Sequence, residues 1–151
     1  LFKTPLKLSK CSDKINQQQT EHLIKLIKNN LPKGGTVAIL GLSYKPNTNV
    51  TEESAGVKIA RQLSKEKISV TSYDPIANIY IEGVSPCSSI RHCLREADIV
   101  IITTPWPEFS HIGTEILKKR AIIIDCWRIL NPEKFKDFNY IAIGVGIERK
   151  N

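Results

Sequence analysis

A single lysine follows the first apolar run of the sequence and is a candidate ligand for an anion. The run TVAIL, residues 36–40, ends at Gly41, and Lys45 comes four residues later, directly before the turn-forming Pro46. A lysine ammonium is a compact charge on a long stem and can neutralise a phosphate group. Most lysines in loops are simply solvated, so the place of Lys45 in the fold must decide between these two interpretations.

Short apolar runs alternate along the sequence with segments of helical period. The runs rich in branched residues span 37–40, 68–73, 99–103, 121–125 and 140–145. The segments with apolar residues every three or four positions span 54–65, 88–97 and 108–119. This alternation predicts an α/β fold, with a doubly wound (Rossmann-like), mostly parallel sheet of about five strands. Ligands of such sheets bind beyond the carboxyl ends of the strands, so Lys45 is expected at the ligand-binding edge.

The region before the first predicted strand divides into two parts. Residues 1–14 are polar and lysine-rich and are expected to form a linker or extended arm. Residues 15–33 are expected to form an amphipathic helix, and residues 34–151 the α/β domain. The apolar stripe of this helix, which we expect to be exposed in a monomer, consists of Leu23, Ile24, Ile27 and Leu31.

The net charge of +7 is concentrated in the N-terminal part of the chain. Residues 1–34 contain seven lysines against two acidic residues, while residues 35–151 contain 15 lysines and arginines against 13 acidic residues. A nucleic-acid-binding domain usually shows a basic stripe on a folded face, with aromatic side chains among the charges. A solvated basic face is therefore preferred and no nucleic-acid partner is predicted. An anionic partner for the N-terminal segment remains the alternative.

Neither the cysteines nor the histidines are spaced as metal ligands. The four cysteines form no CxxC pair and the three histidines lie far apart, so no metal site is predicted. No apolar run approaches the ~20 residues of a membrane helix, and the first residues lack a signal-peptide pattern. A cytoplasmic protein with reduced thiols and no membrane partner is expected. Because the sequence contains no methionine, we also expect a fragment or a processed piece of a longer chain.

The turn after residues 36–40 departs from the dinucleotide-binding fingerprint GxGxxG. The sequence GLSYKP has one glycine, and Pro46 disfavours an immediate helix, so the next helix is expected near Ser54. Asn49 and Glu52 would form a capping box if that helix began earlier. The sequence therefore predicts a longer loop in place of a standard NAD cradle.

An aspartate follows the second predicted strand. In dinucleotide-binding domains an acidic residue near this position binds a ribose. Because the glycine fingerprint is absent here, we expect Asp74 to form a turn with Pro75 instead.

Five motifs, in order, resemble those of the UDP-glucose/GDP-mannose dehydrogenase family. The segment GLSYKPNTNVTEES resembles the signature G-[LF]-[AS]-[FY]-K-x-x-T-x-D-x-R-x-S of its C-terminal, UDP-binding domain. The other four are INQQQ at 15–19, SVTSYDP at 69–75, ADIVIITTPWPEF at 97–109 and IIIDCWRIL at 122–130. The resemblance covers residues 15–146 and implies that residues 15–33 are the central, interdomain helix of this family.

The resemblance implies an NAD-dependent enzyme in the full-length parent. Members of the family oxidise the C6 alcohol of a nucleotide-bound sugar to a carboxylate, in two hydride transfers to NAD through a cysteine-bound intermediate. That cysteine lies in a GGxCxxKD motif, which this sequence lacks, and the GxGxxG domain is also missing. We therefore expect the substrate-binding domain of an NAD-dependent UDP-sugar 6-dehydrogenase, inactive by itself, whose parent makes UDP-uronic acids for surface polysaccharide. A non-catalytic nucleotide-binding or interaction module is the alternative.

The same resemblance implies three partners. They are a nucleotide-sugar substrate, the missing N-terminal NAD-binding domain, and a second copy of the chain. The family dimerises through its central helix, so a homodimer is expected through residues 15–31.

The resemblance also assigns binding roles to four residues. Tyr44 and Lys45 match the family's Phe-Lys, which contacts the nucleotide diphosphate, although Tyr44 would equally fit core packing. Arg128 lies one place later than the arginine of the family's D-x-R motif, so either Trp127 replaces that arginine or the register slips. Trp127 would either stack on a base or fill the core.

Two positions depart from the family signature. Val50 stands where the signature has Asp, and Glu52 stands where it has an arginine that reaches the NAD side of the active cleft. A carboxylate repels a pyrophosphate, so we expect either that the NAD contact of the parent at Glu52 is lost or rewired, or that the loop faces elsewhere.

Overall fold

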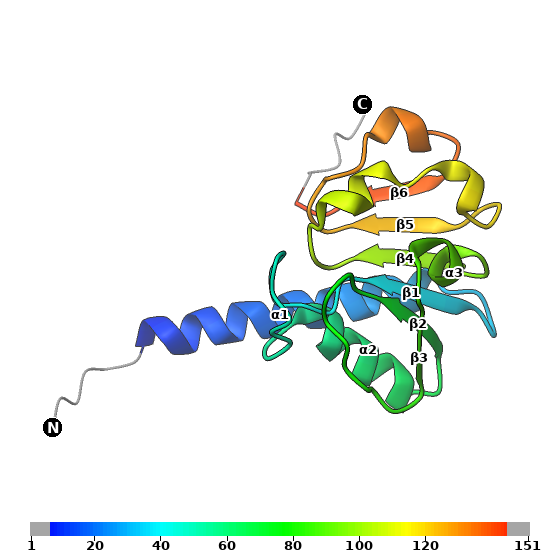
Figure 1. Ribbon diagram of the computed structural model, residues 1–151. Coiled ribbons are helices and arrows are strands. Elements are labelled where there is room, and N and C mark those ends of the chain that lie inside the picture. The colour runs from blue at the N-terminus through cyan, green and yellow to red at the C-terminus, as the bar shows by residue number, and fades with distance from the viewer. Residues whose placement is uncertain (1–6, 145–151) are drawn as a thin grey trace, which may run out of the picture.

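One sheet of six parallel strands organises the computed structural model, which describes residues 7–144 and the side chains of residues 14–144. The strand order is β3-β2-β1-β4-β5-β6, the order of a dinucleotide-binding doubly wound fold (Figure 1). The bounds are β1 Thr36–Leu40, β2 Ser69–Tyr73, β3 Val84–Pro86, β4 Ile99–Ile102, β5 Ile122–Asp125 and β6 Asn139–Ala142. The predicted α/β fold is confirmed.

The sheet has one strand more than predicted. The additional strand, β3, lies at the edge and pairs with β2, with Val84 opposite Val70 and Pro86 opposite Ser72. It is three residues long and has one buried side chain, so no apolar run marks it in the sequence. Its proline is tolerated because an edge strand has one side free of partners.

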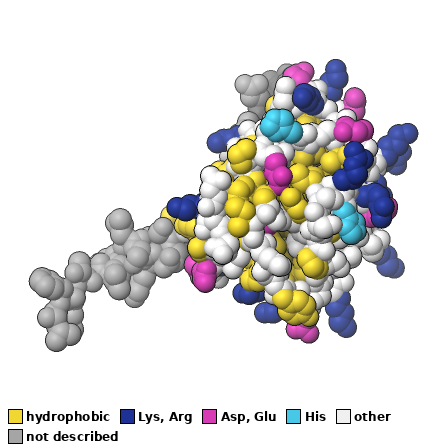
Figure 2. Space-filling view, in the orientation of Figure 1, with side chains coloured by type: hydrophobic (Ala, Val, Ile, Leu, Met, Phe, Trp, Pro, Cys, Tyr) yellow, Lys and Arg dark blue, Asp and Glu magenta, His cyan; other side chains and the backbone are white. Residues whose placement is uncertain are grey.

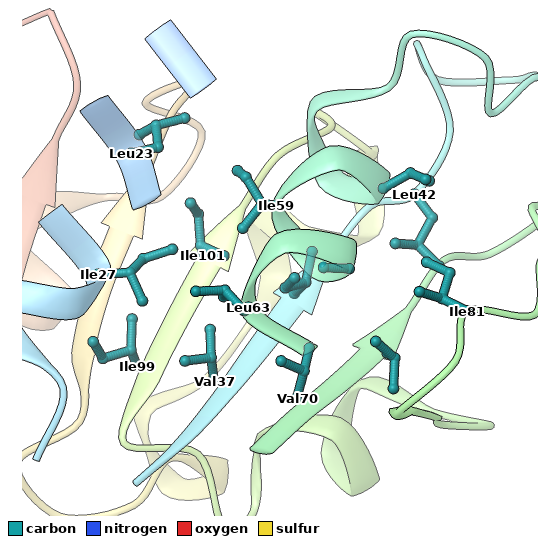
Figure 3. Packing of buried hydrophobic residues seen from close by; sticks show 14 of the residues in the cluster. Leu23, Ile27, Val37, Leu42, Ile59, Leu63, Val70, Ile81, Ile99 and Ile101 are labelled. Carbon is teal, nitrogen blue, oxygen red and sulfur yellow. The ribbon is translucent and has the colours of Figure 1, made fainter. Parts of the chain in front are cut away.

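The two faces of the sheet are covered by different elements. Helices α1, Lys7–Asn30, and α2, Ala55–Lys65, cover one face, and Ile27 and Ile59 from these helices point toward Ile101 of β4 (Figure 3). The short helix α3, Ile90–Leu94, and the 3₁₀ segments contribute to a second apolar cluster on the other face. Because both faces are covered, every residue of β4 is buried, as its branched sequence predicted.

The apolar stripe of α1 packs on the chain's own sheet. Leu23 is 8% exposed and Ile27 is fully buried, while Ile15, nearer the start of the helix, is 55% exposed. The expectation that this stripe is exposed in a monomer is therefore wrong, because the last part of α1 belongs to the core of the domain.

Helix α1 also begins earlier than predicted. It starts at Lys7, inside the segment 1–14 that was expected to be a linker, and residues 1–6 of that segment lie outside the described part of the chain. Lysine and leucine favour a helix even where no apolar stripe marks one. The remaining division of the chain into a helix and a domain stays a prediction.

Of the three helices predicted within the α/β domain, one is shorter than predicted and one is replaced by 3₁₀ segments. Helix α3 spans only Ile90–Leu94, against the predicted 88–97. The helix predicted at 108–119 is wrong, because two 3₁₀ segments, η1 Pro107–His111 and η2 Thr114–Ile116, occupy this region and Gly113 separates them. A third 3₁₀ segment, η3, spans Pro132–Phe135. Among the residues that the structure describes, no helix is both long enough and apolar enough to cross a bilayer.

Candidate functional site

Tyr44 and Lys45 lie in the β1 loop, residues 41–54, at the carboxyl edge of the sheet. Both side chains are exposed, Tyr44 by 60%. The core-packing alternative for Tyr44 is therefore wrong. In the view of Figure 2, Lys and Arg side chains are more numerous on the right, where the strands begin, than on the left, where they end.

The helix after the β1 loop begins where the sequence predicted. The N-cap of α2 is Ser54, whose hydroxyl accepts a hydrogen bond from the Val57 N–H at 3.4 Å. The alternative capping box of Asn49 and Glu52 is wrong, because it required an earlier start. Glu52 is exposed in the loop, and its role toward a cofactor stays a prediction.

Asp74, directly after β2, forms the predicted turn. Its Oδ1 accepts hydrogen bonds from the Ile76 N–H at 3.0 Å and the Ala77 N–H at 2.8 Å. Burial opposes the charge of this carboxyl, but the backbone donors outweigh it, so the pKa of Asp74 lies below its usual value. Asp74 is therefore an anion fixed at the carboxyl edge of the sheet.

The second oxygen of Asp74 binds the β1 loop, which the sequence reasoning missed. Oδ2 accepts from the Leu42 N–H at 2.7 Å, from the Ser43 N–H at 2.9 Å and from the Ser43 hydroxyl at 2.9 Å. The indole Nε1–H of Trp106, from the segment after β4, is shared between the Ser43 hydroxyl oxygen at 3.1 Å and Asp74 Oδ2 at 3.2 Å. One carboxylate thus joins the ends of β1, β2 and β4.

The neighbouring ends of β1 and β4 are held tightly together. The Thr103 hydroxyl donates to the Gly41 carbonyl at 2.6 Å, and the Thr104 hydroxyl donates to the Ser43 carbonyl at 2.7 Å. Gly41 has φ +102°, and a Cβ added there would lie 2.5 Å from Thr104. A Cβ on Gly56 of α2 would lie 2.1 Å from the Gly41 carbonyl oxygen. Only glycine fits at these two positions, because the strand end, the helix and the β4 end touch through their backbones.

A second carboxylate, Asp125, organises the β5 loop, residues 126–131. This side chain is fully buried. Its Oδ1 accepts from the Trp127 N–H at 3.0 Å and the Arg128 N–H at 2.7 Å. Its Oδ2 accepts from the Leu130 N–H at 3.0 Å and the Tyr140 hydroxyl at 2.9 Å. Burial raises the pKa of Tyr140, and the hydrogen bond to Asp125 and the charge of Asp125 raise it further. The Tyr140 hydroxyl therefore stays protonated and remains a donor.

Trp127 and Arg128 project from the β5 loop at the same edge as Lys45. Arg128 is exposed and has φ +57°, a conformation that its N–H bond to Asp125 supports. Trp127 is 51% exposed, so it does not fill the core. Its indole N–H donates to the Thr103 carbonyl at 2.9 Å. Thr103 therefore contacts both loops, through its hydroxyl on the β1 side and its carbonyl on the β5 side.

The described residues offer neither a metal centre nor a reactive thiol. They contain no group of three or more side chains that could hold a metal ion. Burial raises the pKa of the Cys93 and Cys126 thiols to about 12, and it also raises the pKa of Cys87. A cysteine nucleophile acts as its thiolate, so these three thiols are structural at neutral pH. The side chain of Cys11 lies outside the described ones.

A dinucleotide does not fit the β1 loop in the usual way. The N–H groups of Leu42 and Ser43, which directly follow β1, already bind Asp74, and the end of β4 lies against Gly41. A pyrophosphate bound there would have to displace the Asp74 carboxylate. Lys45 and Arg128 are exposed cationic side chains at this edge that could meet an anionic ligand.

A groove between two helices lies away from these strand ends. Its volume is about 750 Å³, and α1 and α2 form its walls. Its lining is mixed in charge and includes Lys28 and Glu66, whose charged atoms lie 2.5 Å apart. The groove is a surface depression between two helices, and none of the four predicted binding residues lines it.

The chain matches one family model. Residues 38–132 match the UDP binding domain of the UDP-glucose/GDP-mannose dehydrogenase family. Among curated proteins, the chain is 30% identical over 156 residues to a UDP-glucose 6-dehydrogenase of Rickettsia felis, covering 94% of this chain and 35% of that protein. It is also 30% identical to a UDP-N-acetyl-D-mannosamine dehydrogenase of Methanocaldococcus jannaschii, covering 93% of this chain and 34% of that protein.

Solved structures agree with these matches. A UDP-glucose dehydrogenase from Pyrobaculum islandicum superposes with a TM-score of 0.69 at 26% identity, covering 89% of this chain and 31% of that one. A UDP-N-acetyl-mannosamine dehydrogenase from Staphylococcus aureus shares the fold, with a TM-score of 0.71, 24% identity and coverage of 85% and 31%. The chain thus spans about a third of the length of the dehydrogenases it matches.

Proposed function

Because this chain belongs to the UDP-glucose/GDP-mannose dehydrogenase family, we propose that it is the C-terminal substrate-binding domain of an NAD-dependent UDP-sugar 6-dehydrogenase. One observation carries the proposal. Two loops at the carboxyl edge of the sheet, joined through Thr103, each present an aromatic side chain followed by a cation. Both loops lie within the residues that match the UDP-binding domain.

Each loop supplies one group for the base and one for the phosphates. Lys45 and Arg128 are the cations, and they are expected to meet the two negative phosphates of UDP; guanidinium and ammonium both bind phosphate oxygens. Tyr44 and Trp127 are half exposed or more, so their ring faces are open to stack on a base. The indole of Trp127 is already oriented by its bond to Thr103, which reduces the entropy lost on binding.

Catalysis is assigned to the rest of the parent chain. Oxidation of the sugar needs a thiolate that can hold the aldehyde, and the thiols of Cys87, Cys93 and Cys126 have raised pKa values. NAD, which supplies the hydride acceptor, would be bound by the missing N-terminal domain. This chain alone is expected to bind substrate without oxidising it. A cytoplasmic location and a substrate of the UDP-hexose class complete the proposal.

The homodimer through residues 15–31 remains part of the proposal in a changed form. Leu23 and Ile27 are buried in the domain itself, so they cannot serve a partner. The parts of α1 left for a second copy are its exposed face and the region around Ile15. A non-catalytic module derived from the same domain is not favoured, because the relatives found are dehydrogenases, although Val50 and Glu52 are both exposed departures from the family signature.

Calorimetric titration tests the proposed function. The chain is titrated with UDP, GDP and UDP-glucose at physiological salt, beside Lys45→Ala and the matched control Lys33→Ala, which removes an exposed lysine close to the amino end of β1. We expect saturable binding of UDP that is about tenfold weaker in Lys45→Ala, because a hydrogen bond to a charged group contributes ~1.5 kcal/mol or more. Lys33→Ala should bind like the wild type. Absence of binding, or an equal loss in both variants, would contradict the proposal.

A further inference from the structure

The amide pair that follows β1 is a site for an anion in other proteins of this strand order. In dinucleotide-binding folds the pyrophosphate lies on the backbone N–H groups of the first turn, at the point where the strand order reverses between β1 and β4. The equivalent groups here are the Leu42 and Ser43 N–H groups, which point at one acceptor and form a concave donor site.

The chain fills this anion site with its own side chain. Asp74 Oδ2 accepts both N–H groups within 2.9 Å, and the Ser43 hydroxyl and the Trp106 indole complete four donors around one oxygen. Oδ1 is fixed from the other side by Ile76 and Ala77. The carboxylate cannot rotate away without losing several hydrogen bonds, so its negative charge stays at the place where a phosphate would bind.

On the side of β4 the space beside the carboxylate is closed as well, while on the side of β2 and β3 Asp74 lines a small hollow of about 270 Å³. The hydroxyls of Thr103 and Thr104 bond across the gap between the β1 and β4 ends, and Gly41 lies against Thr104 at a distance that excludes a Cβ. Within the described residues, the crevice at the strand-order reversal is therefore occupied by backbone and threonine side chains rather than open to a ligand.

We propose that Asp74 is a specificity-determining residue: its carboxylate occupies the anion site of the Leu42 and Ser43 N–H groups and excludes a dinucleotide pyrophosphate from this domain. The phosphates of a bound nucleotide are thereby directed outward, to Lys45 in the β1 loop and Arg128 in the β5 loop. This domain has the strand order of an NAD-binding domain, but it therefore does not compete with the parent's NAD-binding domain for NAD. The outward placement of the phosphates rests on the proposed function, while the occupied anion site does not.

The test uses inorganic pyrophosphate alone and follows the backbone N–H resonances of Leu42 and Ser43 by nuclear magnetic resonance. The variant is Asp74→Ser, because a serine hydroxyl can still accept from the Ile76 or Ala77 N–H but is too short to reach the β1 loop. The control is Asp137→Ala, which removes the same charge from an exposed position and so corrects for general anion attraction.

In the wild type and in Asp137→Ala we expect the Leu42 and Ser43 resonances to show no saturable response. In Asp74→Ser they should shift saturably, because two N–H donors and a hydroxyl become available to the anion. A folded Asp74→Ser protein without this response would overturn the proposal. A saturable response of the Leu42 and Ser43 resonances to pyrophosphate in the wild type would also overturn the proposal. This measurement is decisive even if the variant does not fold.

Failure of the proposed function is read separately. The proposed function fails if the wild type does not bind UDP, or if Lys45→Ala does not weaken that binding. The response of the Leu42 and Ser43 resonances to pyrophosphate in Asp74→Ser does not depend on that result.

Discussion

Two carboxylates at the carboxyl edge of the sheet have different structural roles. Asp74, at the end of β2, binds the loop of a neighbouring strand and leaves it without a free N–H pair at its start. Asp125, at the end of β5, is fully buried and binds the N–H groups of its own loop. The Asp74 carboxylate occupies an anion site, whereas the Asp125 carboxylate fixes the loop that presents Trp127 and Arg128 at the surface.

The difference shows how one strand order can support ligands of different kinds. A parallel sheet brings several loop starts with unpaired N–H groups to one edge, and an anion is the natural partner for such groups. Where the chain supplies that anion itself, the ligand must be held by side chains. The exposed side chains at this edge include Tyr44, Lys45, Trp127 and Arg128, and this combination suits a base linked to phosphates.

The largest effect is expected from removing the buried carboxylate. Asp125→Ala leaves three N–H groups and the Tyr140 hydroxyl without their acceptor, so the free energy of unfolding should fall by about 3 kcal/mol. Urea unfolding monitored by circular dichroism measures this. The exposed Asp137→Ala variant should unfold like the wild type, and an equal urea midpoint for both variants would mean that Asp125 does not organise the β5 loop.

Asp74 is expected to stabilise the fold less, and in a pH-dependent way. Asp74→Asn should lower the free energy of unfolding by about 2 kcal/mol at neutral pH, because an amide offers only one acceptor oxygen. The pKa of Asp74 in the folded state lies below the usual 3.8, so the stabilisation is present above that pH and is lost as the pH falls through the lowered pKa.

The difference in stability between wild type and Asp74→Asn should therefore shrink as the pH is lowered from about 6 to about 3. Asp98, whose pKa is also lowered although burial opposes this, is present in both proteins and cancels in the comparison. A difference that stays constant or grows toward acid would show that the charge of Asp74 is not what holds the β1 loop.

Trp127 provides the next test, on binding. Trp127→Ala should weaken UDP binding by roughly tenfold, since stacking of a base on an aromatic ring contributes ~1–3 kcal/mol. Intrinsic fluorescence gives an independent reading, because the other tryptophan, Trp106, is 5% exposed. UDP should quench the wild type and leave the fluorescence of Trp127→Phe nearly unchanged. Quenching that persists in Trp127→Phe would place the base elsewhere.

The smallest effect is expected from restoring the family's charge in the β1 loop. Glu52→Arg replaces an exposed carboxylate by a cation, so UDP should bind about twofold more tightly at low salt, and the gain should vanish near 1 M salt because exposed charges are screened. Stability should not change. A much larger gain that resists salt would mean that residue 52 contacts the phosphates directly.

The sequence predicted the parts of the molecule that repeat or that carry a motif. The branched runs gave the strands β1, β2, β4, β5 and β6, and the placement of Lys45 at the carboxyl edge followed from their parallel order. The turn at Asp74 was also predictable, because it depends on residues next to it in the chain.

The remainder depended on contacts between distant residues. The bond from Asp74 to Leu42 spans 32 positions, and that from Trp127 to Thr103 spans 24, so no local pattern reveals them. The same holds for Ile27, whose burial against the sheet decides that the α1 stripe is part of the core. Short elements such as β3 were missed because three residues are too few to show a period.

A nuclear magnetic resonance titration of the wild-type chain with UDP tests the central claim most directly. If UDP binds over the outward-facing side chains, the indole N–H of Trp127 and the backbone N–H of Arg128 and Lys45 should show the largest shifts, with one common saturation curve. The N–H groups of Leu42 and Ser43, held by Asp74, should move least. The largest shifts at Leu42 and Ser43, with an unchanged Trp127 indole, would contradict the account.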